Sequence, residues 1–312
     1  MPDVPIWSEC NINCVFCSNP VTGFRGTNEN YTFEAFSRKW ELYLQGKSSF
    51  LKFNAVDDYF SMTGGEPTLN PGFLKILALV RKTWPRKPIK LLTNARMFSY
   101  PQFAKACLAL GGPDFELKVP FFGYDEKTYS AISRTPGAFA EARAGLENIL
   151  KYRSPSQRVT IRIILHRVQL LWLGKLLDFL HDEFPGINAV EFLYVEYEGF
   201  AEQNIKALLV PLTRCGAELG KLEPKLRKFP EYHLLHFPLC ALPRKLWHRA
   251  WRTLDPIKIV HALQCRDCKA LELCVGVHRT YALHCGTEEF KPVKSLAGVT
   301  RSRDPYRPVA KA

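Results

Sequence analysis

Short apolar runs rich in β-branched residues alternate with longer amphipathic runs along the first 200 residues. The short runs are typical of buried strands, and the longer runs repeat apolar residues at the three- and four-residue spacing of helices. Six strands are predicted, at residues 4–8, 58–65, 88–94, 115–122, 158–166 and 188–196. The predicted helices cover residues 31–46, 71–84, 100–112, 137–152 and 170–184, with a sixth at about 202–220.

This alternation predicts how the strands pair. Parallel strands need a crossover between them, and the crossover is usually a helix. Six strand–helix units are fewer than the eight of a complete barrel. The predicted class is therefore α/β, a partial (β/α)6 barrel of the TIM type with an irregular, cysteine-rich C-terminal extension. We expect the barrel at 1–200, the extension at 201–294 and a basic flexible tail at 295–312.

Composition agrees with a globular protein, since 46% of the 312 residues are hydrophobic and 23% are charged. The sequence has no apolar run of the length that a membrane span needs, and its first residues lack a signal-peptide pattern, so we expect a cytoplasmic protein. The net charge is +13, with basic clusters near 243–252 and in the tail. Such a charge favours anionic partners such as nucleic acid, a phosphorylated compound or an acidic peptide, although a solvated basic surface explains it equally.

Three cysteines lie within eight positions directly after the first predicted strand, at Cys10, Cys14 and Cys17. In barrel enzymes the loop after a strand carries the chemistry. Four thiolates would fill the iron positions of a [4Fe–4S] cube, whereas three leave one iron open for another ligand. The alternatives are a zinc site completed by a distant histidine, or cysteines packed as small apolar residues.

A glycine turn, "GGEP" at residues 64–67, follows the second predicted strand. Together with the C-x3-C-x2-C spacing and Phe16 before the last cysteine, it resembles the radical S-adenosylmethionine (radical SAM) superfamily. The resemblance implies that Cys10, Cys14 and Cys17 bind a catalytic [4Fe–4S] cluster. It further implies that the open iron binds S-adenosylmethionine, which is cleaved to a 5′-deoxyadenosyl radical, and that an electron donor such as ferredoxin or flavodoxin reduces the cluster.

The same resemblance implies which residues contact the cofactor: Phe16, Gly64, Gly65, Glu66, Pro67, Asn94 and Arg162. Glycines suit a turn where backbone approaches a ligand closely. "LTNARMF" at 92–98 resembles the Thr-Asn-Gly of the family, with Ala95 in place of the glycine. Arg162 is expected to pair with the cofactor carboxylate, unless its side chain faces solvent.

A second set of cysteines lies in the predicted extension, at Cys240, Cys265, Cys268 and Cys274. Four thiolates make a closed ligand set, and the pattern resembles the auxiliary-cluster (SPASM or twitch) extensions of peptide-modifying radical SAM enzymes. We expect a second [4Fe–4S] cluster here, with structural zinc as the alternative. Cys285 is a substitute ligand, and His278 and His284 flank the set. Cys107 and Cys215 are expected in the core.

Several longer segments resemble the HxsC-like radical SAM maturases, which are named for His-Xaa-Ser repeat peptides and act on ribosomally made peptides. These segments lie at 115–150, 158–180, 190–205 and 239–277. The resemblance implies a peptide or protein substrate. Tyr194 and Glu196 end the sixth predicted strand and are expected to bind the substrate or donate a proton to it.

Two further functions remain open from the sequence. The positive charge favours a radical SAM enzyme that acts on RNA or a nucleotide, whose binding would depend steeply on salt. A non-catalytic nucleic-acid-binding protein with zinc at both cysteine sets is the third possibility, and the GGEP turn argues against it. Metal analysis separates zinc from iron.

Overall fold

The computed structural model describes residues 3–18, 28–47 and 59–311. The chain forms two compact units. The first comprises Met1–Val15, Asn19–Ile161 and Phe184–Asn188, and the second comprises Phe16–Ser18, Arg162–Glu183 and Ala189–Ala312. The division falls inside one strand, β5 (Arg158–Leu165), so the two units are described separately below.

Parallel strands form the centre of the first unit, and each pairs with the next strand along the chain. Side chains on these strands, such as Phe60, Met62, Ile89 and Leu91, are fully buried, as expected where helices cover a parallel sheet. The strands are β1 (Asp3–Trp7), β2 (Phe60–Gly64), β3 (Ile89–Leu92) and β4 (Phe115–Pro120).

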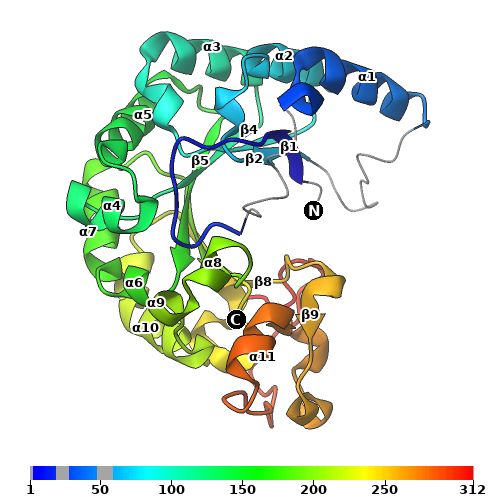
Figure 1. Cartoon of the computed structure of the whole chain (residues 1–312). Coiled ribbons are helices and arrows are strands. Elements are labelled where there is room, and N and C mark those ends of the chain that lie inside the picture. The colour runs from blue at the N-terminus through cyan, green and yellow to red at the C-terminus, as the bar shows by residue number, and fades with distance from the viewer. Residues whose placement is uncertain (1–2, 19–27, 48–58, 312) are drawn as a thin grey trace. The chain divides into compact units, whose positions relative to one another are not determined.

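Helices follow the strands of the first unit, and α1, α2 and α3 lie next to one another in chain order (Figure 1). Thr32 caps α1, because its hydroxyl accepts a hydrogen bond from the Ala35 N–H at 3.1 Å. Trp40 of α1 is buried, whereas Leu44 is half exposed because the helix ends there. The helices are α1 (Phe33–Leu44), α2 (Phe73–Thr83), α3 (Pro101–Gly111), α4 (Glu126–Ser133) and α5 (Ala138–Tyr152).

The second unit continues the pattern with three parallel strands, again paired in chain order. They are β6 (Ala189–Tyr194), β7 (Glu231–Leu235) and β8 (Ala250–Trp251). Its helices are α6 (Arg167–Leu170), α7 (Leu173–Glu183), α8 (Phe200–Gln203), α9 (Ile205–Leu208), α10 (Leu212–Leu226) and α11 (Arg279–Cys285). A separate antiparallel pair joins β9 (Ile259–Val260) to β10 (Val277–His278).

The predicted α/β class with a partial TIM-type barrel is confirmed. The prediction of six strands was too low, because β7 and β8 add parallel strands after β6. Both are short runs inside a segment rich in proline, histidine and cysteine, where no clear periodicity marks them. The helix expected at about 202–220 is replaced by α8, α9 and a later α10, because Pro211 ends the preceding segment and starts a new helix.

The end of the chain folds back on the region around β8. The Arg252 N–H donates to the Tyr306 carbonyl at 2.8 Å, and Arg301 forms a β-bridge with Val309. Val309 is buried. The domain limits at residues 200 and 294 and the flexible character of the tail stay predictions. In the described part of the chain, no helix has the length and apolar character required to cross a membrane.

Candidate functional site

The glycine turn after β2 lies directly against the end of β1. The Gly65 N–H donates to the Trp7 carbonyl at 2.8 Å, and the Glu66 N–H donates to the Glu9 carbonyl at 2.7 Å. A Cβ atom on Gly65 would lie 2.1 Å from the Glu9 oxygen, and one on Gly64 would lie 2.2 Å from the Trp7 oxygen. The glycines are therefore required by backbone packing beside Cys10, in addition to the cofactor approach predicted from the sequence.

Glu66 is buried and connects the turn to the end of β3. Its carboxylate accepts hydrogen bonds from the Thr68 N–H and hydroxyl at 3.2 and 2.5 Å, from the Thr93 hydroxyl at 2.7 Å and from the Asn94 N–H at 2.7 Å. Burial raises the pKa of Glu66, and these bonds oppose the shift. The carboxylate thus has four donors from its own chain, which suits a positioning role, and the predicted contact with the cofactor stays a prediction. Pro67 starts the 3-10 turn η2 (Pro67–Leu69) next to it.

Asn94 directs its side-chain amide at the cysteine loop. Its Nδ2 atom lies 3.8 Å from Cys10 Sγ and 2.7 Å from Asn11 Oδ1. An amide donor beside a thiolate stabilises the negative charge of a metal-bound sulfur. The structure thus brings Asn94 and Cys10 together, although they follow β3 and β1, which lie on either side of β2.

Ala95 follows with a left-handed backbone, at φ +63°. This conformation explains why glycine is expected at the position, because L-residues with a Cβ pay a steric cost there. The Ala95 carbonyl also packs against Gly145 of α5, where a Cβ would lie 2.0 Å from the oxygen. Ala95 thus adopts the backbone conformation that the Thr-Asn-Gly motif would give to glycine, and its Cβ makes this conformation less favourable than it would be for glycine.

The three cysteines of the first motif differ in exposure: Cys10 is exposed, Cys14 is buried and Cys17 is partly buried. In the first unit, Asn13 and Val15 donate backbone hydrogen bonds of 2.9 Å to the carbonyls of Ser133 and Ile132 at the end of α4. These bonds fix the loop that carries Cys14. In the second unit, the Cys17 carbonyl accepts from the Phe200 N–H at 2.8 Å, and the Phe16 ring lies 5.6 Å from the His166 ring.

Arg162 of β5 pairs with a carboxylate of its own unit. Its Nε atom lies 3.3 Å from Glu191 Oε2 on β6, and the two side chains are 18% and 6% exposed. The solvent-facing alternative is therefore disfavoured. The partner in the structure is Glu191, which the sequence reading missed, and the predicted pairing of Arg162 with the cofactor carboxylate stays a prediction.

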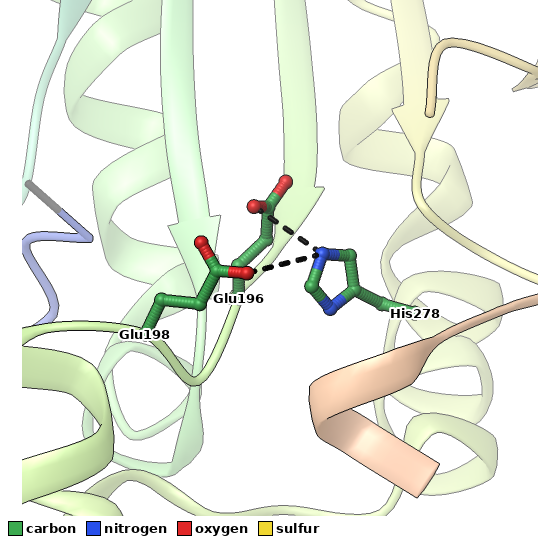
Figure 2. Close-up of side chains that lie close together, drawn as sticks. All are labelled: Glu196, Glu198 and His278. Atoms are coloured by element: carbon green, nitrogen blue, oxygen red, sulfur yellow. Dashed lines mark ion pairs between the residues drawn. The ribbon is translucent and has the colours of Figure 1, made fainter. Parts of the chain in front are cut away.

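Glu196 and Glu198 follow β6 and face the same imidazole, that of His278 (Figure 2). His278 Nε2 lies 3.4 Å from Glu196 and 4.0 Å from Glu198. Lys258 Nζ lies 2.7 Å from Glu196 and 3.7 Å from Glu198, and His236 approaches Glu196 to 3.6 Å. One ligand atom from each of Glu196, Glu198 and His278 lies within 4.8 Å of the others, which is a spacing that suits a metal ion, but Lys258 already supplies a positive charge at this place.

The protonation of Glu196 decides which of its predicted roles is possible. Burial raises the pKa of Glu196, but its interactions with His278, His236 and Lys258 outweigh burial and hold the pKa well below the ordinary range. Glu196 is therefore ionised at neutral pH. The geometry supports a substrate contact through hydrogen bonds to the carboxylate. A pKa this low makes Glu196 a weak base as well as disfavouring the predicted proton donor.

Tyr194 is placed in an aromatic core, and its side chain is 2% exposed. Its hydroxyl bonds to the Tyr197 hydroxyl at 2.9 Å and to the Val210 carbonyl, and its ring packs on Phe237 and Tyr281. Burial raises the pKa of Tyr194 far above its usual value. This environment favours a packing role over the predicted substrate contact.

The four cysteines of the second set line one pocket. Backbone N–H groups point at two of the sulfurs: Leu239 and Gly276 donate to Cys274 Sγ at 3.4 Å each, and Val293 donates to Cys268 Sγ at 3.3 Å. Burial raises the pKa of Cys240 to about 12, and the neighbouring thiols add to the shift. Such thiols ionise only when a cation replaces their protons, so the donor set suits a metal centre.

The other predicted ligands and core cysteines are also placed. Cys285 ends α11 and does not line this pocket. His278 faces Glu196, and His284 lies 3.4 Å from Glu202. Cys107 and Cys215 are fully buried, as predicted for core thiols.

Comparisons with known proteins place these features in a family. The family described as the radical SAM superfamily matches residues 4–180, which is more than half of the chain. The PqqA peptide cyclase of Rhodopseudomonas palustris is 24% identical over 261 residues, covering 79% of this chain and 62% of that protein. The chain thus spans less than two thirds of that curated relative.

Solved structures show the same fold at low identity. SuiB of Streptococcus suis bound to S-adenosylmethionine has a TM-score of 0.60 at 11% identity, covering 93% of this chain and 76% of SuiB. SuiB bound to the precursor peptide SuiA has a TM-score of 0.54 at 12% identity, covering 74% of this chain and 48% of that one. These likenesses establish the architecture and leave the substrate open.

Proposed function

Because the chain belongs to the radical SAM superfamily, we propose that it is a radical SAM enzyme that modifies a ribosomally made peptide or protein. Family membership implies a [4Fe–4S] cluster and S-adenosylmethionine. It argues against the hypothesis of a non-catalytic nucleic-acid-binding protein with zinc at both cysteine sets. When bound, the cluster and S-adenosylmethionine supply a 5′-deoxyadenosyl radical that abstracts hydrogen from a substrate. The peptide substrate and the residue roles below are the parts that we propose.

Cys10, Cys14 and Cys17 would hold the first cluster. The observation that supports this best is the contact between Asn94 Nδ2 and Cys10 Sγ, which provides an outer donor to a sulfur ligand. The loop that carries Cys14 is held by backbone bonds to the end of α4. Glu66 would orient Asn94 by accepting a hydrogen bond from its backbone N–H, which links the glycine turn to the residue beside Cys10.

A peptide substrate is supported by the relatives, since the curated one is named a peptide cyclase and SuiB was solved with a precursor peptide. Within this chain, the ionised carboxylate of Glu196 follows β6, the end of a strand at which barrel enzymes place substrate groups. Glu196 would accept a hydrogen bond from the peptide. His278 and Lys258 would hold the carboxylate in place for this role.

Cys240, Cys265, Cys268 and Cys274 would hold a second, closed [4Fe–4S] cluster. The N–H groups of Leu239, Gly276 and Val293 support this, because donors to sulfur tune the potential of such clusters. Structural zinc on the same thiols is the alternative, and it would have no redox role.

The proposal is tested by anaerobic reconstitution followed by incubation with a reductant and S-adenosylmethionine. Formation of 5′-deoxyadenosine tests the enzyme class. Addition of candidate peptides encoded beside the gene then tests the substrate class, since a modified peptide shows a mass change. Cleavage of the cofactor with no change in any such peptide, but with a modified RNA or nucleotide, would contradict the peptide assignment.

A further inference from the structure

Two basic segments that lie far apart in the sequence meet in one pocket of the second unit. Arg244, Lys245 and His248 come from the segment after β7, and Lys311 comes from the end of the chain. The pocket has a volume of about 440 Å³, which is in the range of ligand pockets. The sequence shows both segments as basic clusters but gives no sign that they are neighbours.

Among these cations, Arg244 and Lys311 are the ones available to a ligand. Lys245 is paired with Glu223 at 2.7 Å, and His248 accepts a hydrogen bond from Arg249 at 3.1 Å. Arg244 donates one N–H to the Ser295 carbonyl at 2.9 Å and lies over the Trp247 ring, and its guanidinium makes no ion pair with a described residue. Lys311 is exposed and makes no ion pair with any described residue.

The remaining lining is mostly aliphatic. Val299 and Val309 contribute to it, with small residues at 297, 298 and 310. Trp247 is the aromatic residue of the lining, but it is only 5% exposed, and Arg244 lies over its ring at 5.3 Å. A single-stranded nucleic acid is usually held by exposed aromatic rings on which its bases stack. Aliphatic side chains beside cations instead suit a peptide in which acidic and apolar residues alternate.

We propose that this pocket binds an acidic segment of the peptide substrate, with carboxylates at Arg244 and Lys311 and an apolar side chain against Val299 and Ala310, the partly exposed aliphatic residues of the lining. The inference rests on the proposed peptide substrate and names the chemistry of the part that is recognised. Electrostatic complementarity of this kind steers a flexible chain to its enzyme and sets its register.

The test measures binding alone. A short fluorescein-labelled peptide of glutamate and leucine is titrated with the full, anaerobically reconstituted protein, and the anisotropy gives Kd. The comparison probe has glutamine in place of glutamate. The wild type should bind the acidic probe more tightly, and Arg244→Gln with Lys311→Gln should weaken that binding about tenfold.

The matched control removes two positive charges elsewhere. Lys206 and Lys228 are exposed and do not line the pocket, so Lys206→Gln with Lys228→Gln should change Kd less than about twofold. Lys311→Gln alone removes no contact with a described residue, and it should weaken binding about threefold without affecting folding.

Three results would overturn the proposal. Equal weakening by the pocket and control variants would mean that net charge alone attracts the probe. Equal binding of the acidic and glutamine probes would mean that no carboxylate is recognised. Competition by a single-stranded oligonucleotide that is lost in the pocket variant would make the pocket a polyanion site for nucleic acid. Cofactor cleavage, measured on the same samples, separates these failures from a failure of the proposed enzyme class.

Discussion

The Glu66 carboxylate accepts the N–H of Asn94 at 2.7 Å, and the side-chain amide of Asn94 lies 3.8 Å from Cys10 Sγ. These two contacts connect the glycine turn to the first cysteine through Asn94, which follows β3. The turn is therefore linked to the loop that carries Cys10 through a buried carboxylate. The predictions for this region rest on that connection.

Replacing Glu66 by glutamine should destabilise the fold by about 1–3 kcal/mol. Glutamine keeps only one side-chain oxygen for the four donors, and its NH2 group would face at least one donor that has lost its acceptor. Urea unfolding of the protein measures the change. Glu147→Gln is the control, since Glu147 is 53% exposed and pairs with Arg143 on the surface. A Glu66→Gln protein as stable as the control would disprove the positioning role.

Substitution of Gly65 should disturb the cluster as well as cofactor binding. A Cβ would lie 2.1 Å from the Glu9 carbonyl, directly before Cys10, so even alanine must displace the loop. We expect Gly65→Ala to bind less iron at the first site and to cleave little cofactor. Gly174→Ala in α7 meets only the flexible ends of the Leu222 and Lys225 side chains and should keep wild-type iron content. Normal iron together with lost cofactor binding would favour the simpler reading, in which the glycine only makes room for the ligand.

Ala95→Gly should stabilise the protein by about 0.5–1 kcal/mol. The left-handed backbone at φ +63° costs an alanine more than a glycine, and this gain exceeds the greater flexibility of glycine in the unfolded chain. Thermal unfolding with matched iron content measures the difference. A lower melting temperature for the variant would show that the buried methyl group contributes more than the backbone conformation costs.

The stability of the second unit should fall as the pH falls below about 6.5. Burial lowers the pKa of His236 to about 4 from an ordinary 6.5, so the neutral imidazole is favoured in the folded state. The contribution of neutral His236 to the free energy of unfolding is complete above its pKa in the unfolded chain, and it is lost as the pH falls from 6.5 toward 4. Glu196, whose pKa is lowered, adds to the loss only below about pH 4.5.

His236→Asn tests this dependence, because asparagine tolerates the left-handed backbone at φ +69° and does not titrate. Between pH 6.5 and 5, its free energy of unfolding should fall less steeply than that of the wild type, by up to about 1 kcal/mol per pH unit. His181→Asn is the control, because the His181 side chain on α7 is 39% exposed. Equal slopes for the wild type and His236→Asn would rule out His236 as the titrating group.

The sequence predicted the parts of the site that depend on local spacing. Cys10, Cys14 and Cys17 lie within eight positions of one another, and Gly64 and Gly65 mark the end of a strand. Their spacing alone therefore predicts the motif. Strand–helix alternation likewise predicted the class of the fold, because each element has its own periodicity.

Contacts between distant residues left no such signal. Glu66 meets Thr93 and Asn94 from the next strand, and Glu196 meets Lys258 and His278 from the C-terminal region. The role of a carboxylate depends on how many donors fold around it, which spacing alone does not reveal. From the sequence, Glu66 was predicted to contact the cofactor, and Glu196 was predicted to bind the substrate or donate a proton. The structure adds that Glu66 has four donors around the turn and that Glu196 is held ionised.

The central claim is that Cys10, Cys14 and Cys17 hold the cluster that cleaves S-adenosylmethionine. The most direct measurement compares 5′-deoxyadenosine formed by the reconstituted, reduced wild type with that formed by the triple variant Cys10→Ala, Cys14→Ala and Cys17→Ala, together with iron per chain. We predict about eight irons and cofactor cleavage for the wild type, and about four irons and no cleavage for the variant, whose second cysteine set is unchanged. Cleavage of S-adenosylmethionine by the triple variant at the wild-type rate would contradict the account.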